Sequence, residues 1–174
     1  MSEKYCKRCD RTLPIWDFHK DKNSKDGHAF YCKKCTYTLG KKYRHTPRGI
    51  YKCAKTRQTY YRRHNDPRMK PFKISLNWFL EWYASQEKKC VYCNIPEELL
   101  SVVDDIYNNK CTNLTLDCMD NDKGYTEKNL VLSCLRCNYT KSNLLSFDEM
   151  YEIGQKYFKP KWQQNIKISF DNKL

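Results

Sequence analysis

Eight of the eleven cysteines stand in four Cys-x-x-Cys pairs, a spacing that presents two thiolates from one tight turn. Each pair supplies half of a tetrahedral zinc site, so two pairs complete one site. A buried or redox-active thiol is the alternative, and it fits two complete quartets less well. Paired in chain order, the cysteines predict two structural zinc sites, formed by Cys6, Cys9, Cys32 and Cys35 and by Cys90, Cys93, Cys134 and Cys137. Because four thiolates leave zinc no open position, we expect neither ion to be catalytic.

Polar residues between the last two pairs suit a different metal. Asp117 ends an apolar run, Asn129 opens the next one, and Asn138 falls in the first turn of the segment that follows. A hairpin docked on a helix would bring Asp117 and Asn138 together. Carboxylate and amide oxygens suit Mg²⁺ or a similar divalent cation, and two such ligands leave positions for water and phosphate. On the residues alone, turn or cap roles are an open alternative.

The elements expected to position these residues have a β-β-α order. Apolar runs predict strands at 114–118 and 130–133, followed by a short helix starting near Cys137. The pattern Ser146-Phe-Asp-Glu149 is typical of a capping box that opens a final helix, and Pro160 is expected to stop that helix at about Phe158.

Two further helices are expected before the β-β-α unit. Thr46-Pro47 can begin a basic helix over roughly 47–64, and Ser75 can cap a second one over 76–86. The aromatic residues of the second helix are expected to pack as scaffold. Residues 1–40, with two cysteine pairs and several turn residues, are expected to form a loop-rich metal module with few regular elements.

The net charge of +13 is unevenly placed, because residues 33–70 carry thirteen Lys or Arg against the single acid Asp66. A basic segment without a clean apolar face favours nucleic acid over a membrane surface, with a solvated charged face as the alternative. The residues expected to contact DNA are Arg44, Arg48, Lys52, Lys55, Arg57, Arg62 and Arg63.

Length and composition limit the remaining possibilities. A chain of 174 residues divided into small parts buries little apolar surface, so metal binding should contribute to its stability. The start lacks an apolar signal segment, and no run approaches the roughly 18 apolar residues that span a bilayer. We therefore expect a soluble, intracellular protein, located wherever its DNA target resides, with no membrane partner.

The segment from Cys90 to Asn143 resembles HNH endonucleases of the ββα-metal class. Its motifs are C-x-Y-C, L-D-x-x-D-N-x-K-G-Y-T-x-x-N-L-V-L-S-C-x-x-C-N and K-S-N, and they cover about a third of the chain. The leading cysteine module resembles the zinc module that precedes HNH domains in some phage and restriction nucleases. Together, the order of parts is most similar to small, rare-cutting HNH restriction endonucleases that act as homodimers.

This resemblance implies roles for single residues. Asp117 and Asn138 would be ligands of the catalytic cation, Asn129 would fix the hairpin loop by side-chain hydrogen bonds, and Lys141 could contact the scissile phosphate. The chain departs from the family at Cys118, where the general base His, or Arg in some relatives, usually stands.

A proton acceptor other than Cys118 is therefore expected. The better candidates are His64 and His45, from outside the motif, and Tyr92, inside the C-x-Y-C pair, is another. For each of them phosphate contact or packing is the alternative role. Cys53, Cys111 and Cys118 lie outside the zinc quartets.

The sequence thus predicts a small α+β protein with a zinc-stabilised ββα-metal core and flanking helices. Its expected parts are an N-terminal zinc module (1–40), a basic helix and linker (41–74), a nuclease domain (75–159) and a C-terminal tail (160–174). The expected function is metal-dependent hydrolysis of double-stranded DNA, in restriction, homing or nicking, with a homodimer as a further expectation. The alternatives are a catalytically silent zinc-dependent DNA-binding protein and an RNA-directed nuclease.

Overall fold

A computed structural model describes residues 2–101 and 113–171, with the backbone alone for 168–171. Cys111 lies outside the described residues. The chain forms two compact units, residues 1–49 and 50–174, and the boundary between them falls inside helix α2 (Pro47–Arg63). Within the described residues, no helix is long and apolar enough to span a bilayer.

The first unit contains two antiparallel hairpins and a helix, so the expectation of few regular elements in residues 1–40 was wrong. The elements are β1 (Glu3–Cys6), β2 (Arg11–Pro14), a 3₁₀ turn (Ile15–Asp17), β3 (Phe18–Lys20), β4 (His28–Cys32) and α1 (Lys33–Arg44). β1 pairs with β2, and β3 pairs with β4. Their strands are only three to five residues long, too short for an alternating apolar pattern to be visible in the sequence. Cys6, Phe18 and Cys32 form the buried centre.

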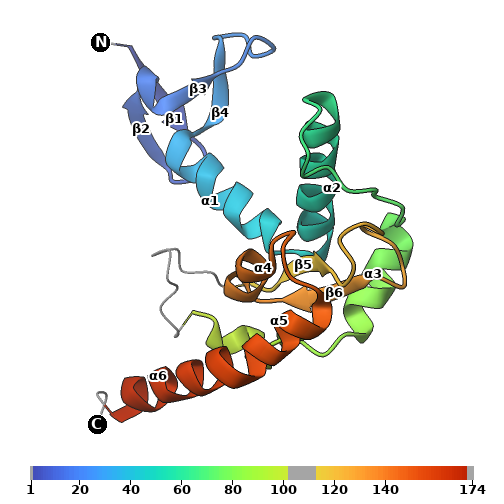
Figure 1. The fold of residues 1–174 in the computed structure, drawn as a ribbon. Helices are drawn as coiled ribbons and strands as arrows, with labels where there is room; N and C mark the ends of the chain where they lie inside the picture. The colour runs from blue at the N-terminus through green and yellow to red at the C-terminus, as the bar shows by residue number, and fades with distance from the viewer. Residues whose placement is uncertain (1, 102–112, 172–174) are drawn as a thin grey trace. The chain divides into compact units, whose positions relative to one another are not determined.

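The second unit is built around the predicted hairpin and helix, shown in Figure 1. β5 (Thr115–Cys118) pairs antiparallel with β6 (Leu130–Ser133), and α4 (Leu135–Lys141) follows directly. α4 begins two residues before the predicted start because Cys134 acts as its N-cap, accepting a hydrogen bond from the backbone N–H of Cys137.

Residues 50–63 of α2 join the core of the second unit along one face. Ile50, Tyr51, Ala54 and Gln58 are buried at helical spacing. After the helix, α3 (Leu76–Ser85) and a 3₁₀ turn (Glu97–Leu99) complete this side of the core. The Ser75 side chain caps α3 as predicted, accepting from the N–H of Trp78.

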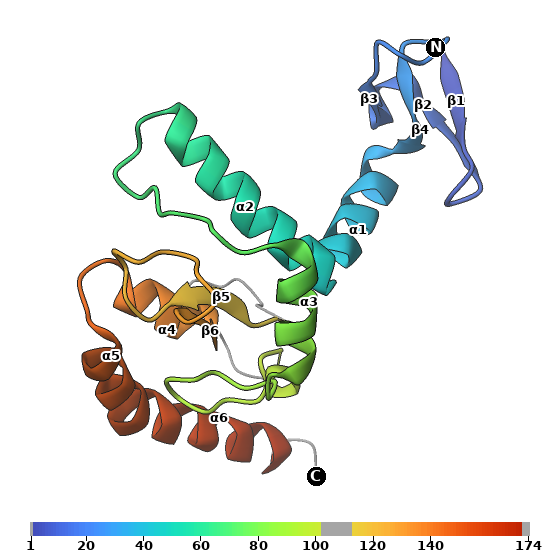
Figure 2. The ribbon, with the colours of Figure 1, turned by 90° about the vertical axis from the view of Figure 1, so that its right-hand side faces the viewer.

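The final helix continues past Pro160, contrary to the prediction. α5 (Phe147–Ile153) starts with the predicted capping box and runs through a π-helical turn (Gly154–Phe158) into α6 (Lys159–Asp171), along the continuous path visible in Figure 2. Pro160 lies in the first turn of α6, immediately after the wider π turn, where a missing backbone donor is tolerated. Residues 160–171, which were predicted to belong to a tail, are therefore helical.

Candidate active site

The structure brings together both predicted cysteine quartets. In each, the four sulfur atoms lie within 4.8 Å of one another. The Sγ atoms of Cys93 and Cys134 are 3.8 Å apart, and a tetrahedron with Zn–S bonds of about 2.3 Å has S–S edges of about 3.8 Å. All cysteines of both quartets are free thiols. The donor chemistry and spacing therefore fit structural zinc.

The second quartet also determines where the neighbouring side chains lie. Cys90 and Cys93 form a turn that anchors Tyr92, while Cys134 and Cys137 hold the first turn of α4 next to the same turn. The Val91 N–H donates to the carbonyl of Leu132 at 2.9 Å, which fixes this turn on β6. Tyr92 and the residues of α4 consequently face β5.

Asp117 lies on β5 with 4% of its surface exposed. The Tyr92 hydroxyl donates to Oδ2 at 2.8 Å, and the backbone N–H of Cys118 donates to Oδ1 at 2.8 Å. Burial raises the pKa of Asp117, whereas the Lys141 ammonium and the Tyr92 hydroxyl oppose the shift. Burial and the carboxylate also raise the pKa of Tyr92, so this phenol stays protonated at neutral pH and acts as a donor to Asp117.

Asn138 packs on the same strand from α4. Its Nδ2 donates to Oγ1 of Thr115 at 2.9 Å and to the carbonyl of Leu116 at 3.1 Å. These bonds commit the amide nitrogen to the strand and leave the amide oxygen as an acceptor. Thr115 and Asp117 share one face of β5, because alternate residues of a strand point the same way. Asp117 and Asn138 therefore belong to one β5–α4 interface and offer two hard oxygen donors suited to a divalent cation.

Lys141 is one helical turn from Asn138 and is completely buried. Its Nζ donates to the carbonyl of Cys118 at 2.9 Å and to Oδ1 of Asn121 at 3.2 Å, and lies 3.9 Å from Oδ1 of Asp117. Burial lowers the pKa of Lys141, and Asp117 opposes that shift. In this structure Lys141 is thus positioned to compensate the charge of Asp117, and the expected contact with a phosphate would require it to become exposed.

Asn129 connects both ends of the hairpin loop. Its Nδ2 donates to the carbonyls of Asp120 and Gly124, both at 2.7 Å, and its Oδ1 accepts from the N–H of Asp120 at 2.9 Å. Three hydrogen bonds from one buried amide hold the loop that follows Asp117 in a single conformation.

Cys118 occupies the position where the resemblance to HNH endonucleases implies a general base. Its side chain is 1% exposed, and burial raises the pKa of the thiol to about 12. At neutral pH this residue is therefore a neutral thiol, which is unsuited to accept a proton from water.

The two candidate histidines lie outside the β5–α4 interface. His64 follows the end of α2 and packs on the Tyr60 ring, with a centroid distance of 4.3 Å. His45 caps the C-terminal end of α1 in the first unit. A role for either residue in catalysis stays a prediction.

Lys70 and Asn121 are site residues that the sequence did not reveal. Lys70 donates from Nζ to Oδ1 of Asn121 at 2.5 Å, and Asn121 Nδ2 donates to the carbonyl of Ser142 at 3.3 Å. Lys70 comes from the segment before α3, far from the motif in sequence. Only the position of Asn121 within the D-N pair of the motif offered a signal.

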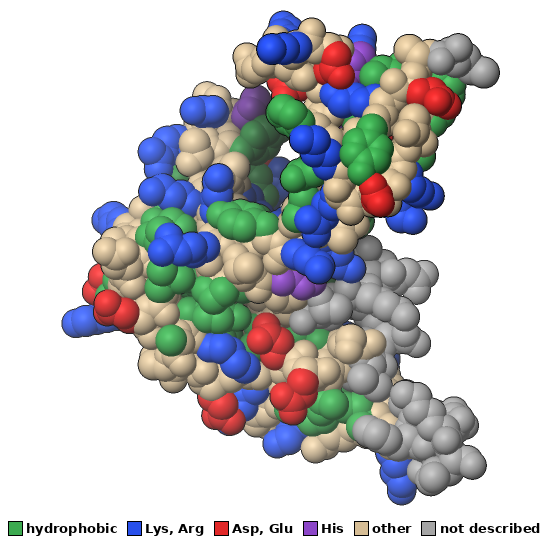
Figure 3. Space-filling model, turned by 180° about the vertical axis from the view of Figure 1, so that it is seen from behind, with side chains coloured by type: hydrophobic (Ala, Val, Ile, Leu, Met, Phe, Trp, Pro, Cys, Tyr) green, Lys and Arg blue, Asp and Glu red, His purple; other side chains and the backbone are tan. Residues whose placement is uncertain are grey.

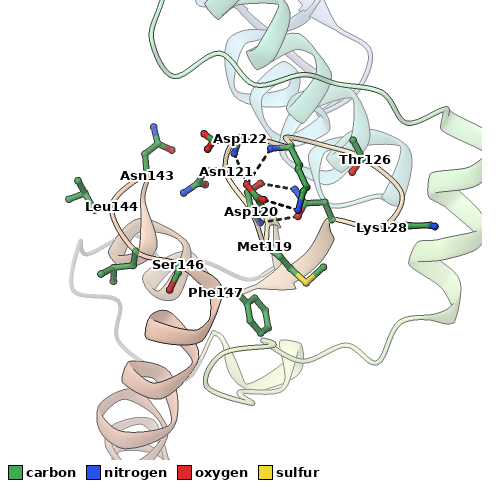
Figure 4. A pocket seen from close by; sticks show the side chains of 13 residues that line it. Met119, Asp120, Asn121, Asp122, Thr126, Lys128, Asn143, Leu144, Ser146 and Phe147 are labelled. Atoms are coloured by element: carbon green, nitrogen blue, oxygen red, sulfur yellow. Dashed lines mark hydrogen bonds and ion pairs between the residues drawn. The ribbon is translucent and has the colours of Figure 1, made fainter.

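An open cavity of about 700 Å³ lies beside the hairpin loop. Figure 4 shows Asn121 and Asp122 from the loop on one side, with Asn143 from the α4–α5 connection facing them. The Asp120 carboxylate on its wall is paired with Lys123 at 2.9 Å. The lining is polar and mixed in charge, so the cavity alone does not define a ligand.

The expected DNA-contacting residues of the second unit lie on the solvent face of α2. One face of α2 is buried in the core. The opposite face is exposed and carries five cations: Lys52, Lys55, Arg57, Arg62 and Arg63. Figure 3 shows Lys and Arg side chains gathered over the region of α2. Arg44 and Arg48 are exposed in the first unit, where α1 adds Lys33, Lys34, Lys41 and Lys42.

Of three comparisons with known proteins, the search of solved structures gives a match. No family model matches the chain, and no curated protein does. Among solved structures, the chain is similar to the rare-cutting HNH restriction endonuclease PacI, with 22% sequence identity and a TM-score of 0.52. The match covers 92% of this chain and 96% of that one. The two four-cysteine clusters and this likeness confirm the predicted fold class: the chain has the fold of a zinc-braced HNH, or ββα-metal, endonuclease.

Proposed function

We propose that the chain is a divalent-metal-dependent endonuclease acting on double-stranded DNA, with Asp117 and Asn138 as ligands of the catalytic cation. The observation that supports this proposal is the β5–α4 interface, where Asp117 lies on β5 and Asn138 is hydrogen-bonded to the same strand from α4, so that the two offer a carboxylate and an amide oxygen. The likeness to an HNH restriction endonuclease supports it.

A bound divalent cation such as Mg²⁺ would supply stabilisation of the negative charge that develops on the phosphate. The chain's own residues would prepare the ligands. Tyr92 and the Cys118 N–H hold the two oxygens of Asp117, Lys141 compensates its charge, and Thr115 orients Asn138. Ligands held by such outer partners keep their geometry when the metal binds.

The proton acceptor for the attacking water is proposed to come from outside the β5–α4 interface. The protonated thiol of Cys118 is unsuited, and the Tyr92 hydroxyl already donates to Asp117. His64 is the first candidate because it adjoins the basic face of α2. His45 is the second.

DNA would bind through the cations of α2 and α1. An uncompensated basic face attracts the phosphate backbone without reading its sequence. If about six phosphates are engaged, the logarithm of affinity should fall with the logarithm of salt concentration with a slope near −5. Two further expectations remain predictions. One is that the protein forms a homodimer, as the resemblance implies, and the other is that it is located where its DNA target resides.

The proposal is tested by incubating supercoiled and linear DNA with the zinc-loaded protein, with and without Mg²⁺. Asn138→Ala should abolish cleavage while retaining DNA affinity. Asn77→Ala is the matched control, because it removes an exposed asparagine of α3, outside the β5–α4 interface and the hairpin loop, and should leave the cleavage rate unchanged. Wild-type protein that binds DNA but never cuts it would contradict the proposal, and preferential cutting of RNA would redirect it.

A second candidate is a catalytically silent, zinc-dependent DNA-binding protein. The observation in its favour is the buried, protonated thiol at Cys118, the position where the resemblance to HNH endonucleases implies a base. The same assay separates the two candidates, since a silent binder has no Mg²⁺-dependent cleavage for Asn138→Ala to remove.

A further inference from the structure

Lys70 is held beside the candidate active site by several independent contacts. Its backbone N–H donates to Oε1 of Gln58, a buried side chain of α2, at 2.7 Å. The carbonyl of the next residue, Pro71, accepts from the N–H of Tyr125 at 2.8 Å, and Phe72 forms a parallel bridge with Tyr125. The segment carrying Lys70 is thus fastened both to α2 and to the hairpin loop.

The loop is shaped to accept this segment. Gly124 has a φ of +62°, and a Cβ at that position would lie 2.5 Å from the carbonyl oxygen of Pro71. Only glycine allows both the backbone conformation and the close approach. The position of Lys70 is therefore built into the hairpin rather than left to a mobile surface side chain.

Two ammonium groups share one neutral acceptor at this place. Oδ1 of Asn121 accepts from Nζ of Lys70 at 2.5 Å and from Nζ of Lys141 at 3.2 Å. Asp117, the carboxylate paired with Lys141, is 3.9 Å from that lysine. Two carboxylates lie near these cations, but Asp120 is already paired with Lys123 at 2.9 Å, which leaves Asp117 for both Lys70 and Lys141. The two like charges are therefore stabilised when a further anion joins them.

We infer that Lys70 binds a phosphate group of the nucleic-acid backbone next to the Asp117–Asn138 site, with Lys141 as the buried charge behind it. Lys70 is only partly buried, whereas Lys141 has no exposed surface, so Lys70 is the ammonium that a phosphate can reach. This inference rests on the proposed function for its ligand. It adds a residue from outside the HNH motif to the site.

The test measures two properties of the zinc-loaded protein: the salt dependence of DNA binding and the single-turnover rate of cleavage with Mg²⁺. Lys70→Gln keeps a long side chain that can still donate to Asn121 but removes the charge. It should reduce the salt slope by about 1 and slow cleavage at saturating protein by roughly tenfold or more. Lys70→Arg should retain the wild-type slope and most of the rate.

Lys89→Ala is the control, because it removes an equal charge from a partly exposed lysine whose ammonium is already paired with Glu87 at 2.7 Å. It should change neither property. A thermal melt of each variant identifies any loss of folding, and Lys70→Arg still tests the inference if Lys70→Gln unfolds.

The outcomes separate the inference from the proposed function. Wild-type protein that binds DNA without cleaving it contradicts the nuclease assignment, while the salt slopes still test the phosphate contact. If wild-type protein cleaves DNA and folded Lys70→Gln keeps both its slope and its rate, the role of Lys70 is wrong. A slope change equal to that of Lys89→Ala also overturns it.

Discussion

Replacing Lys141 by methionine should destabilise the second unit strongly. The substitution retains most of the apolar stem but removes a completely buried ammonium whose neighbours are the Asp117 carboxylate, the Cys118 carbonyl and Asn121. At 3.9 Å, the attraction between Lys141 and Asp117 is about 4 kcal/mol for an effective dielectric constant of about 20. Removing one member of a buried ion pair typically lowers the free energy of unfolding by about 3–5 kcal/mol. We expect Lys141→Met to lower it by an amount in that range.

The assay is urea unfolding of four zinc-saturated proteins at pH 8: wild type, Lys141→Met, Asp117→Asn and the double variant. If the loss arises from an uncompensated carboxylate, the double variant should recover more than half of it, which the double-mutant cycle measures as a coupling energy. A loss below about 1 kcal/mol for Lys141→Met, or strict additivity of the two substitutions, would refute the account of this pair.

The same variants give a pH dependence whose sign follows from burial. Folding raises the pKa of Asp117 above the ordinary value of 3.8. The folded protein therefore holds the carboxyl proton more tightly than the unfolded chain does. As a result, the free energy of unfolding falls as pH rises from 3.8 towards the raised pKa of the folded protein. Without Lys141 the pKa of Asp117 rises further. The destabilisation by Lys141→Met should therefore become smaller as pH falls from 8 towards the raised pKa of Asp117, with the zinc sites common to both proteins.

Three other predictions concern zinc, a thiol and a glycine. Metal analysis should find two zinc ions per chain. A strong chelator should abolish the cooperative unfolding transition, because structural zinc contributes on the order of 10 kcal/mol or more to the free energy of folding. Retention of the transition after zinc removal would contradict this prediction. Iodoacetamide at pH 8 should label Cys53 before Cys118 in the folded protein, because burial keeps the Cys118 thiol protonated. Peptide mass mapping would detect the order of labelling. Gly124→Ala should lower the free energy of unfolding by about 1–3 kcal/mol through its positive φ and its contact with Pro71, and urea denaturation that shows unchanged stability would exclude that contact.

The sequence predicted those parts of the site whose signals are local. The cysteine pairs define their own turns, and two complete quartets leave one simple pairing, which the structure brings together. The strands beside Asp117 and Asn129 are short apolar runs bounded by turn residues, and they lie within one residue of their expected bounds. Local capping patterns likewise placed the starts of α3 and α5.

Features that depend on distant contacts were not predictable in this way. Lys70 reaches Asn121 across fifty-one positions of sequence, and nothing around Lys70 distinguishes it from the other cations of the basic segment. The burial of Lys141 depends on the docking of α4 against β5, so nothing in the sequence indicated that its ammonium lies 3.9 Å from the Asp117 carboxylate. Pro160 shows the limit of a local rule, because a π turn before it lets the helix continue.

The most direct test of the central claim is the cleavage rate of fully bound duplex DNA as a function of Mg²⁺ concentration, for wild type and Asp117→Asn. We expect the wild-type rate to rise with Mg²⁺, to saturate and to vanish with a chelator that leaves the zinc sites intact. Asp117→Asn should be slower by about 100-fold or more, since loss of several kcal/mol of transition-state stabilisation has that effect. Equal rates for the two folded proteins, or wild-type cleavage without a divalent cation, would contradict a catalytic metal held by Asp117 and Asn138.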